Sequence, residues 1–485
     1  PMYPTIEAIA AYGRHGLGDR PLIMCEYRHA RGNSNGSLAD YWDVITTTPG
    51  LQGGFIWAWT DHGLLTRLPN GKRGFAYGGQ FGDEPNDANF VADGLMSADL
   101  RPHPAMQEVA WVHRPVVVEL DRGALRVTNR RSFTDLDDLV ARWELLVGGE
   151  VVASGELGVA APDGGPVAPA STVTFELPCA VPDAPDAHLT VRWFQRRGRP
   201  WAARGHLVAW DQLELDPIAS SDASDASDGS DGSDGSDGAA AGASGGNDAA
   251  VALASAVEVC VFRAPVDNDG LKLMPNLGED FQAGIKALGR WRRDGVDRIA
   301  ADELVEHHHD VEMLSDGAQV HTHRVVVPDA LDDLARVGVT FELRPGFDRV
   351  RWYGRGPLEN YPDRCRGAVL GVWESGVDAS PYLVPQEFGL RTDCRWFEFI
   401  DPSTNEVVRL DVLGPTVMHV SATRFTDQDL YGASHETDLR PRRSLVVHAD
   451  VAHRGLGTAS CGPDVLDRYR IAPGVHRFSY RLSRR

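Results

Sequence analysis

The sequence predicts a multidomain protein that begins with an α/β region and continues with two regions made almost entirely of β-strands. Apolar runs at 21–25 and 51–61 flank a helical stretch at 38–47, an order typical of a strand, a crossover helix and a parallel strand. From about residue 113 onward, apolar and polar residues alternate in short runs, as they do in antiparallel sheets with one buried face. These patterns divide the chain into an α/β part and two all-β parts.

The α/β region covers residues 1–112. Both of its predicted strands lack alternation, which indicates strands that are buried on two faces. Because the region contains only about two such strands, it is too small for a closed barrel or a wound sheet. We therefore expect it to be the end of a larger α/β domain.

Two β-sandwiches are expected after this region. Residues 113–216 have the size and strand pattern of an immunoglobulin-like sandwich, and residues 251–485 contain enough short strands for a large all-β sandwich, with helical periodicity mainly in 280–293. Between them, residues 217–250 consist of Ser-Asp-Gly triplets and an Ala-rich stretch that have nothing to bury. This composition favours a disordered linker over an acidic ion-binding segment.

Charge and cysteine usage exclude several kinds of partner and fold. The formal net charge is −21 and the pI is near 5.2, whereas nucleic acids and anionic membranes require clustered Lys and Arg, so neither is expected as a partner. The six cysteines show no metal-ligand spacing, which indicates reduced thiols. No apolar run is long enough for a membrane span and the first residues do not resemble a signal peptide, so we expect a cytoplasmic location.

Glu26 ends the first apolar run, in the stretch PLIMCEYRHARGNSNG at 21–36. If this run is a strand of an α/β barrel, its carboxyl end faces the active site and Glu26 is aimed at substrate. Retaining glycoside hydrolysis uses such a carboxylate together with a second one roughly 5 Å away. Tyr27, His29 and Asn33 are expected to donate hydrogen bonds to Glu26 or to sugar hydroxyls. The alternative is that Glu26 is simply an exposed strand end.

The second apolar run supplies Phe55, Trp57 and Trp59, whose rings suit the apolar faces of a sugar, although such clusters more often fill a core. Residues 75–106 are dense in Gly, Asp and Asn and have few hydrophobic side chains, which points to a functional loop. This loop carries acidic side chains, and a second carboxylate is the partner that Glu26 needs for glycoside hydrolysis.

Two histidine groups stand out in the last region. One is HHHD at 307–310, and the other is His321 with His323, which share one face of a predicted strand. Each could bind a metal ion, but the simpler interpretation of each group by itself is a solvated strand edge.

Seven ordered segments between residues 21 and 391 resemble a known family. They are CEYRHARGNSNG, LQGGFIWAW, YGGQFGDEPND, DGLMSADLRPHPAMQE, RAPVDND, WYGRGPLENYPDR and PQEFGLR. Together they closely resemble the C-terminal half of the large bacterial β-galactosidases of glycoside hydrolase family 2. The resemblance implies that residues 1–112 are the C-terminal end of a (β/α)₈ TIM barrel, that 113–216 are an immunoglobulin-like β-sandwich and that 251–485 are the large C-terminal β-sandwich.

The resemblance also implies roles for individual residues. Glu26 matches the catalytic nucleophile, His29 a residue that contacts galactose, and Trp57 the aromatic floor of the sugar subsite. Cys461 stands where some relatives carry a tryptophan that stacks on the leaving-group sugar, so it matches a substrate-binding position, and this departure leaves the preference for the leaving group open.

Mg²⁺ and Na⁺ are the cofactors that the resemblance implies. The carbonyl of Phe90 and the side chain of Asp93 match the family's sodium-site positions, the second of which is commonly Asn, and a carboxylate there should hold a cation at least as well. Asn86 matches an asparagine near the active-site magnesium.

The function implied is retaining hydrolysis of terminal β-D-galactose from β-galactosides such as lactose, through a covalent galactosyl-enzyme. The family's acid/base glutamate, two magnesium ligands and a tyrosine beside the nucleophile are expected on earlier barrel strands that this chain does not contain. A separate N-terminal half or a homo-oligomer is therefore an expected partner. One alternative is an inactive carbohydrate-binding or assembly module that needs a separate N-terminal chain. Another is an intact glycosidase that uses Asp83 or Glu84 as its acid.

Overall fold

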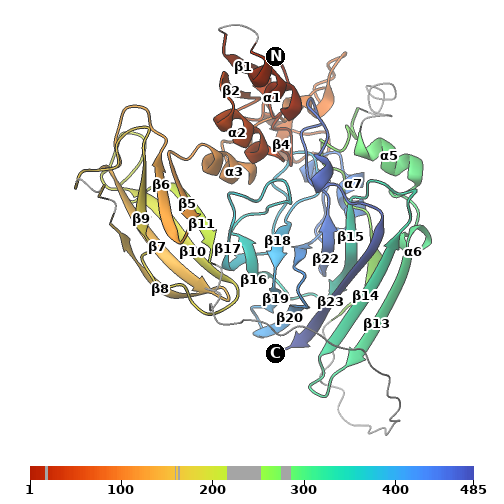
Figure 1. Ribbon diagram of the computed structural model, residues 1–485. Coiled ribbons are helices and arrows are strands. Elements are labelled where there is room, and N and C mark those ends of the chain that lie inside the picture. The colour runs from red at the N-terminus through yellow and green to blue at the C-terminus, as the bar shows by residue number, and fades with distance from the viewer. Residues whose placement is uncertain (17–19, 159, 162–163, 216–252, 275–285) are drawn as a thin grey trace.

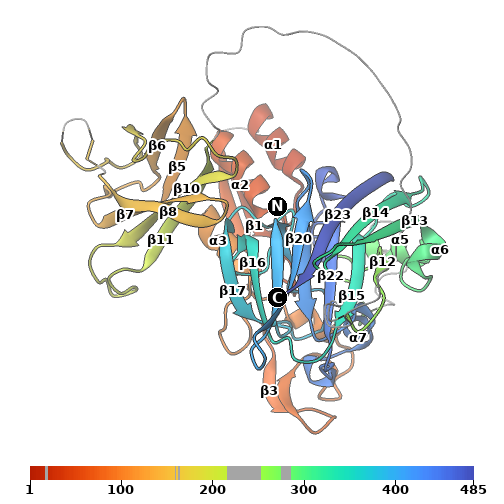
Figure 2. The ribbon, with the colours of Figure 1, turned by 90° about the horizontal axis from the view of Figure 1, so that it is seen from below.

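The computed structural model describes residues 1–16, 20–158, 160–161, 164–215, 253–274 and 286–485, and the predicted linker at 217–250 lies outside these. Most of the described chain is β-sheet. An N-terminal fragment with helices lies against two all-β units, one on each side of it (Figures 1 and 2).

The N-terminal fragment contains the predicted strand, helix and parallel strand. Strand β1 (Leu22–Tyr27) pairs in parallel with β2 (Leu51–Ile56), and helix α2 (Leu38–Thr47) connects them. Helix α1 (Ile6–His15) precedes them and begins where the Thr5 hydroxyl accepts a hydrogen bond from the Ala8 N–H. The sequence prediction of a parallel α/β pattern is confirmed here.

Only one face of the β1–β2 pair is covered. Leu22 and Met24 pack against the helices, whereas Ile23 and Phe55 are 46% and 67% exposed. The prediction that both strands are buried on two faces is therefore wrong for the described chain, because the helices cover one face of this small sheet and nothing described covers these side chains on the other.

The rest of the fragment is largely loop. It contains a hairpin, a short 3₁₀ turn and a helix, which are β3 (Leu64–Arg67), β4 (Arg73–Ala76), η1 (Ala88–Val91) and α3 (Ala105–Val112). In Figure 2 the β3 hairpin extends away from the fragment below the larger β unit. Helix α3 leads directly into the first all-β unit.

The first all-β unit is a sandwich of a three-stranded sheet and a four-stranded sheet. The first has the order β5-β6-β9 and the second β11-β10-β7-β8. Its strands are β5 (Val116–Asp121), β6 (Ala124–Asn129), β7 (Leu139–Val147), β8 (Glu150–Leu157), β9 (Thr172–Glu176), β10 (Ala187–Gln195) and β11 (Leu207–Glu214). Apolar residues of both sheets, Val118, Leu189 and Trp193 among them, form one core.

The second all-β unit packs a five-stranded sheet, β12-β15-β22-β21-β18, against a seven-stranded sheet, β13-β14-β23-β20-β19-β16-β17. Its strands are β12 (Glu258–Cys260), β13 (Glu306–Met313), β14 (Gln319–Val327), β15 (Arg336–Leu343), β16 (Arg349–Gly356), β17 (Val369–Gly376), β18 (Arg391–Cys394), β19 (Trp396–Asp401), β20 (Glu406–Leu413), β21 (Met418–Thr423), β22 (Leu445–His453) and β23 (Gly474–Arg484). The described helices and turns at its edges are α5 (Ala287–Asp294), α6 (Ala301–Leu304), α7 (Asp427–Gly432), η3 (Glu436–Asp438) and η4 (Asp467–Tyr469). Part of the predicted helical stretch at 280–293 lies outside the described residues.

The loop at 28–37, which follows β1, is buried between the fragment and the large sandwich. Arg31 lies 3.5 Å from the carboxylate of Asp267, and it donates a hydrogen bond to the side chain of Asn89. Arg364 donates to the carbonyl of Ser34 over 2.6 Å. The motifs that follow residue 262 thus hold this loop in place.

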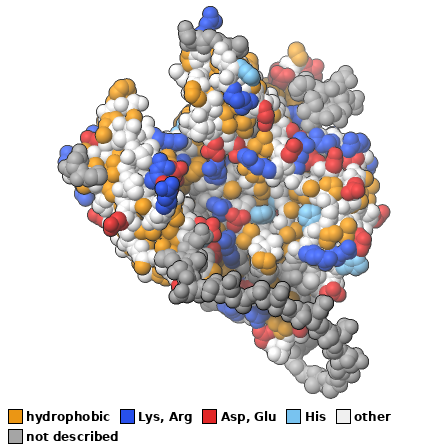
Figure 3. All heavy atoms as spheres, in the orientation of Figure 1, with side chains coloured by type: hydrophobic (Ala, Val, Ile, Leu, Met, Phe, Trp, Pro, Cys, Tyr) orange, Lys and Arg blue, Asp and Glu red, His pale blue; other side chains and the backbone are white. Residues whose placement is uncertain are grey.

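The visible surface carries charges of both signs. Figure 3 shows Lys and Arg side chains interspersed with Asp and Glu over the face of Figure 1. Among the described residues, no helix has the length and apolar character required to cross a membrane.

Candidate active site

Glu26 lies at the end of β1, and its Oε2 accepts a hydrogen bond from the Tyr3 hydroxyl over 2.8 Å. Backbone pairing places Tyr3 there: its N–H donates to the Glu26 carbonyl, and Met2 pairs with Glu26 in parallel. Burial raises the pKa of Tyr3, and its hydrogen bond to Glu26 raises it further, so the hydroxyl stays protonated and can donate. The expectation that the tyrosine beside Glu26 lies outside this chain is wrong.

Tyr27 and Asn33 direct their polar groups away from Glu26, contrary to expectation. The Tyr27 hydroxyl accepts a hydrogen bond from the indole N–H of Trp42 over 2.9 Å. Asn33 donates to the Tyr361 hydroxyl and to the Glu387 carbonyl, both over 2.8 Å. Tyr27 thus connects β1 to helix α2, and Asn33 connects its loop to the large sandwich that covers it.

His29 is buried beside the end of β1, the strand that carries Glu26. Its Nδ1 lies 3.1 Å from the Ser460 hydroxyl, and its Nε2 lies 3.8 Å from Oδ2 of Asp93. Burial lowers the pKa of His29 to about 3, and the positive charge of Arg31 lowers it as well, so the imidazole is neutral at pH 7. A neutral imidazole at this position can exchange hydrogen bonds with a hydroxyl group of a ligand.

Trp57 follows β2 and is oriented by Asp93. Its indole N–H donates to Oδ2 of Asp93 over 2.9 Å, and the backbone N–H of Ala58 donates to the Asp93 carbonyl over 2.6 Å. The side chain of Trp57 remains 44% exposed. Its ring is therefore fixed and open to solvent, as a platform for a sugar ring must be.

Asp93 also has one carboxylate oxygen suited to a cation. Oδ1 is buried without a hydrogen-bond donor among the described residues, and Nδ1 of His62 is 3.4 Å away. Burial raises the pKa of Asp93, the direction expected for a carboxylate that lacks a strong counter-charge. The residues present thus fit a sodium ion held by Asp93, with Phe90 in the turn η1 three residues earlier.

Asn86, unlike Asp93, has no side-chain group that is clearly available to a cation. Its amide closes its own loop, donating to the Asp83 carbonyl over 2.9 Å and accepting from the Ala88 N–H over 3.0 Å. Within the described ranges, groups of three or more His, Cys, Asp or Glu with ligand atoms close together occur only in the large sandwich. The residues around Asn86 therefore do not by themselves fit a magnesium ion.

Asp83 is poorly suited to be the second catalytic carboxylate. Both of its carboxylate oxygens accept from the Gly79 N–H, at 3.1 and 3.0 Å. This bond lowers the pKa of Asp83, whereas a general acid at neutral pH requires a raised one.

Cys461 lies on the loop of the large sandwich that reaches the N-terminal fragment. Burial raises the pKa of its thiol, and the hydroxyl of the preceding residue, Ser460, lies 3.1 Å from Nδ1 of His29. The structure thus brings Glu26, His29, Trp57, Asp93 and Cys461 to one place, from two units of the fold.

Two residues of this group, Tyr3 and Ser460, were missed in the sequence. Tyr3 reaches Glu26 through pairing of neighbouring extended segments, and no local pattern signals that. Ser460 precedes Cys461, so the position of Cys461 could have pointed to it.

Comparisons with protein families cover nearly the whole chain. Residues 2–118 match the glycosyl hydrolases family 2 TIM barrel domain. Residues 125–216 match β-galactosidase domain 4, and residues 242–483 match the β-galactosidase small chain. The order of the three matches follows the order of the three structural units.

Curated relatives give the same result. The chain is 31% identical to a β-galactosidase of Photobacterium profundum, over 96% of this chain and 49% of that protein. It is 33% identical to one of Aeromonas hydrophila, over 94% of this chain and 47% of that protein. A third, from an Arthrobacter species, is 31% identical over 96% of this chain and 50% of that protein. The chain spans about half the length of the curated relatives it matches.

A barrel-domain fragment with a carboxylate at a strand end, followed by two β-sandwiches, defines the class of multidomain glycosidases. Within that class, the chain belongs to glycoside hydrolase family 2 and corresponds to the C-terminal half of its β-galactosidases.

Proposed function

We propose that this chain carries the nucleophile half of a retaining β-galactosidase active site. The observation that carries the proposal is Glu26, a carboxylate at the carboxyl end of a parallel strand, with a protonated tyrosine hydroxyl bonded to it and a fixed indole nearby. Glu26 attacks the anomeric carbon of a β-galactoside as the bond to the glycosidic oxygen breaks, and the acid/base residue of the other half protonates that oxygen. Water then hydrolyses the covalent galactosyl-enzyme and releases galactose and Glu26. His29 and Trp57 bind the galactose, one through hydrogen bonds and the other through its ring face.

Tyr3 and Asp93 support this chemistry as positioning residues. The Tyr3 hydroxyl holds Oε2 of Glu26, which leaves the other carboxylate oxygen to attack. Asp93 holds Trp57, and with the carbonyl of Phe90 it would bind Na⁺. When bound, Na⁺ supplies a fixed positive charge to which sugar hydroxyls can be oriented. Cys461 faces the leaving group, and its small side chain removes the aromatic stacking surface that some relatives have.

The other half of the site is proposed to come from an N-terminal half that completes the barrel. Ile23, Phe55 and Trp59 are exposed side chains of β1, β2 and the segment after β2. We infer that these exposed apolar side chains belong to a surface that another segment covers. In this proposal β1 and β2 are the last strands of a (β/α)₈ barrel, whose earlier strands carry the acid/base glutamate and the magnesium ligands, and the unit from β5 to β11 is an immunoglobulin-like sandwich.

Hydrolysis of a chromogenic β-galactoside tests the proposal. The chain is assayed alone, then mixed with the N-terminal half of one of the relatives above, and then as Glu26→Gln in the same mixture. We expect the chain alone to be slower by at least about 10² to 10⁴, the contribution of general acid catalysis. We expect full activity only in the mixture, and its loss in Glu26→Gln.

The second candidate is a module that binds carbohydrate or supports assembly without catalysis. It is favoured by the exposed Trp57 ring, which needs no second carboxylate to bind a sugar. If the mixture shows no hydrolysis but galactose still quenches tryptophan fluorescence in the chain and not in Trp57→Ala, the module is the better description.

A further inference from the structure

Four histidines gather on one face of the edge strand pair β13–β14. His307 and His309 lie on β13, and His321 and His323 on β14, with His309 directly opposite His323. Residues two apart on a strand share a face, and directly opposite residues share it too. The two histidine groups that looked separate in the sequence are therefore one cluster.

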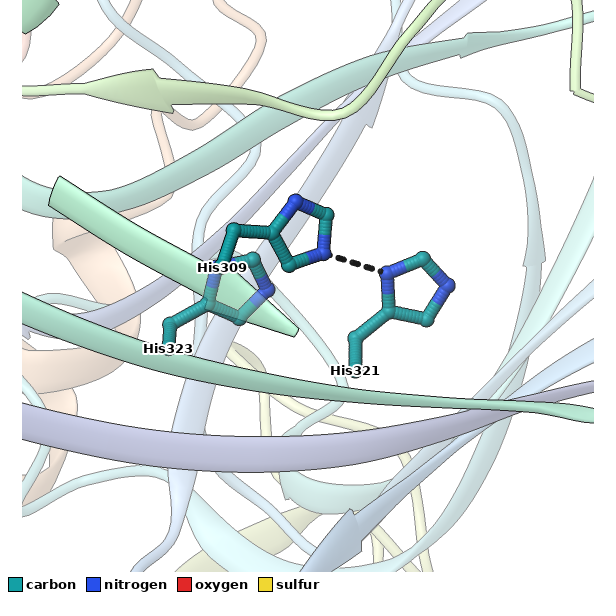
Figure 4. Close-up of side chains that lie close together, drawn as sticks. All are labelled: His309, His321 and His323. Carbon is teal, nitrogen blue, oxygen red and sulfur yellow. Dashed lines mark hydrogen bonds between the residues drawn. The ribbon is translucent and has the colours of Figure 1, made fainter. Parts of the chain in front are cut away.

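The ring nitrogens of three of these histidines converge. His309, His321 and His323 each offer one nitrogen, and the three lie within 4.8 Å of one another. Nε2 of His309 is 2.9 Å from Nδ1 of His321, the pair joined by a dashed line in Figure 4. The ring of His323 stacks on that of His309 with centroids 4.1 Å apart. Zinc binds imidazole nitrogen at about 2.0–2.1 Å, so neighbouring ligands of a tetrahedral ion are about 3.3 Å apart, and small side-chain shifts would form such a site.

The surroundings of the cluster hold the rings in place. His321 and His323 are 2% and 1% exposed, and they stack against Tyr480 and Phe478 of β23. The neutral imidazole is the form that binds a metal ion.

A hydrogen bond at the far side of the His321 ring leaves its inner nitrogen with a lone pair for a metal ion. Nε2 of His321 lies 3.0 Å from the Gln319 side-chain oxygen, which can only accept, so this nitrogen carries the proton and Nδ1 has the lone pair. Nε2 of His323 lies 3.3 Å from the Tyr480 hydroxyl. Partners of this kind orient the imidazole ligands of metal sites.

We propose that His309, His321 and His323 form a binding site for a divalent late transition-metal ion, for which Zn²⁺ is the test ion. Three neutral nitrogen donors without a carboxylate select Zn²⁺, Ni²⁺ or Cu²⁺ over Mg²⁺ and Ca²⁺. His309 is only half-buried, so water can complete the coordination. His307 lies beside the site, with its Nε2 3.0 Å from Nδ1 of His323, and the bound ion would replace this contact. The ion would fasten the edge strand β13 to β14, and it plays no part in the proposed glycosidase chemistry at Glu26.

The test is zinc binding to the full chain after treatment with a chelator and exchange into metal-free buffer. We compare the unchanged chain with His309→Gln and with the matched control His308→Gln. His308 lies on the same strand but is exposed and pairs with Glu306 on the outer face. We expect one Zn²⁺ per chain for the unchanged protein and for His308→Gln, and at least about 100-fold weaker binding for His309→Gln, the loss of one of three ligands.

Thermal unfolding in the presence of Zn²⁺ or Mg²⁺ gives a second measurement that needs no variant. A bound ion stabilises the folded chain, so we expect Zn²⁺ to raise the unfolding temperature and Mg²⁺ to leave it unchanged. The proposal is overturned if the unchanged chain binds no stoichiometric Zn²⁺, if Zn²⁺ and Mg²⁺ act alike, or if His308→Gln and His309→Gln lose binding equally.

Discussion

The N-terminal fragment and the large C-terminal sandwich differ in how completely they bury their sheets. In the sandwich, the facing sides of the five- and seven-stranded sheets form one core, with Val339, Phe399 and Leu482 fully buried. In the fragment, the parallel pair β1–β2 is covered by helices on one side only, and Ile23 and Phe55 are exposed on the other.

This difference shows where stability and chemistry reside. The residues proposed for catalysis lie on the fragment, which has few buried apolar contacts of its own. The loop at 28–37 is held by the sandwich through Arg31, Ser34 and their partners. The sandwich therefore serves as the support on which Glu26 and His29 are positioned, in addition to supplying Ser460 and Cys461.

The largest expected effect comes from Glu26→Gln. The amide keeps the size of the side chain and still accepts the hydrogen bond of Tyr3, but it cannot act as a carboxylate nucleophile. In the chain complemented by an N-terminal half, we expect hydrolysis to fall by on the order of 10⁴-fold or more. A leaving group that needs no proton, such as 2,4-dinitrophenol, isolates this step. Retention of activity within tenfold, at an unchanged unfolding temperature, would remove Glu26 from the mechanism.

Two buried arginines allow the stability of the fragment to be tested separately from that of the sandwich. Arg263 pairs with Asp269 inside the sandwich, and Arg31 pairs with Asp267 across the contact with the fragment. Arg31→Met leaves the buried carboxylate of Asp267 without its arginine, at a cost of about 3–5 kcal/mol, whereas Arg263→Met leaves Asp269 with Arg454 as its remaining arginine partner. We expect Arg263→Met to lower the free energy of global unfolding and Arg31→Met to release the fragment locally, with faster amide exchange in β1 and β2. If both variants unfold the whole chain in one identical transition, the two regions are not distinct.

Acid should weaken the ion-pair network that joins the last loop to the sandwich. Asp464 is buried, which raises its pKa, but Arg454 and Arg290 outweigh this and bring the pKa to about 2, below its ordinary value of 3.8. A lowered carboxyl pKa contributes stability that is fully present above pH 4 and is lost as the pH falls through about 2. We expect Asp464→Asn to lose about 2 kcal/mol at pH 7 and to show a flatter acid dependence in denaturant titrations between pH 4 and 2. Parallel curves for the two proteins would contradict this.

The smallest effect on the isolated chain is expected at the exposed face of the fragment. Trp59→Ser should change the stability of this chain by no more than about 0.5 kcal/mol, because the side chain is exposed. The same change should weaken association with the N-terminal half, measured by titration calorimetry. Phe133→Ser is the matched control, since Phe133 is 94% exposed but lies in the first sandwich. Equal effects of the two variants on association would show that this face is not the docking surface.

Much of the fold could be predicted because the spacing of apolar residues along a short segment indicates which of its faces is buried. The parallel pair around α2 and the alternating strands after residue 113 follow directly from apolar spacing. The one-sided exposure of β1 could not be predicted, because a run of apolar residues is the same whether or not its second face is covered within this chain.

The site was harder to predict because its contacts are distant in sequence. Asn33 was expected to donate to Glu26 or to a sugar hydroxyl, but partners more than 300 residues away bury it, among them Tyr361. Tyr3 is 23 residues from Glu26 and reaches it only through pairing beside β1. The histidine groups looked unrelated until the β13–β14 register placed His309 opposite His323. Strand pairing, and not composition, decides each of these contacts.

Covalent trapping tests the central claim most directly. The chain, together with an N-terminal half that restores hydrolysis, is treated with 2,4-dinitrophenyl 2-deoxy-2-fluoro-β-galactoside, whose fluorine slows release of the galactosyl-enzyme. Intact mass and peptide mapping then locate the label. We predict one fluorogalactosyl group per chain, on the peptide that contains Glu26, and none in Glu26→Gln. A label on another carboxylate, or turnover without any covalent species on this chain, would contradict the assignment of Glu26 as the nucleophile.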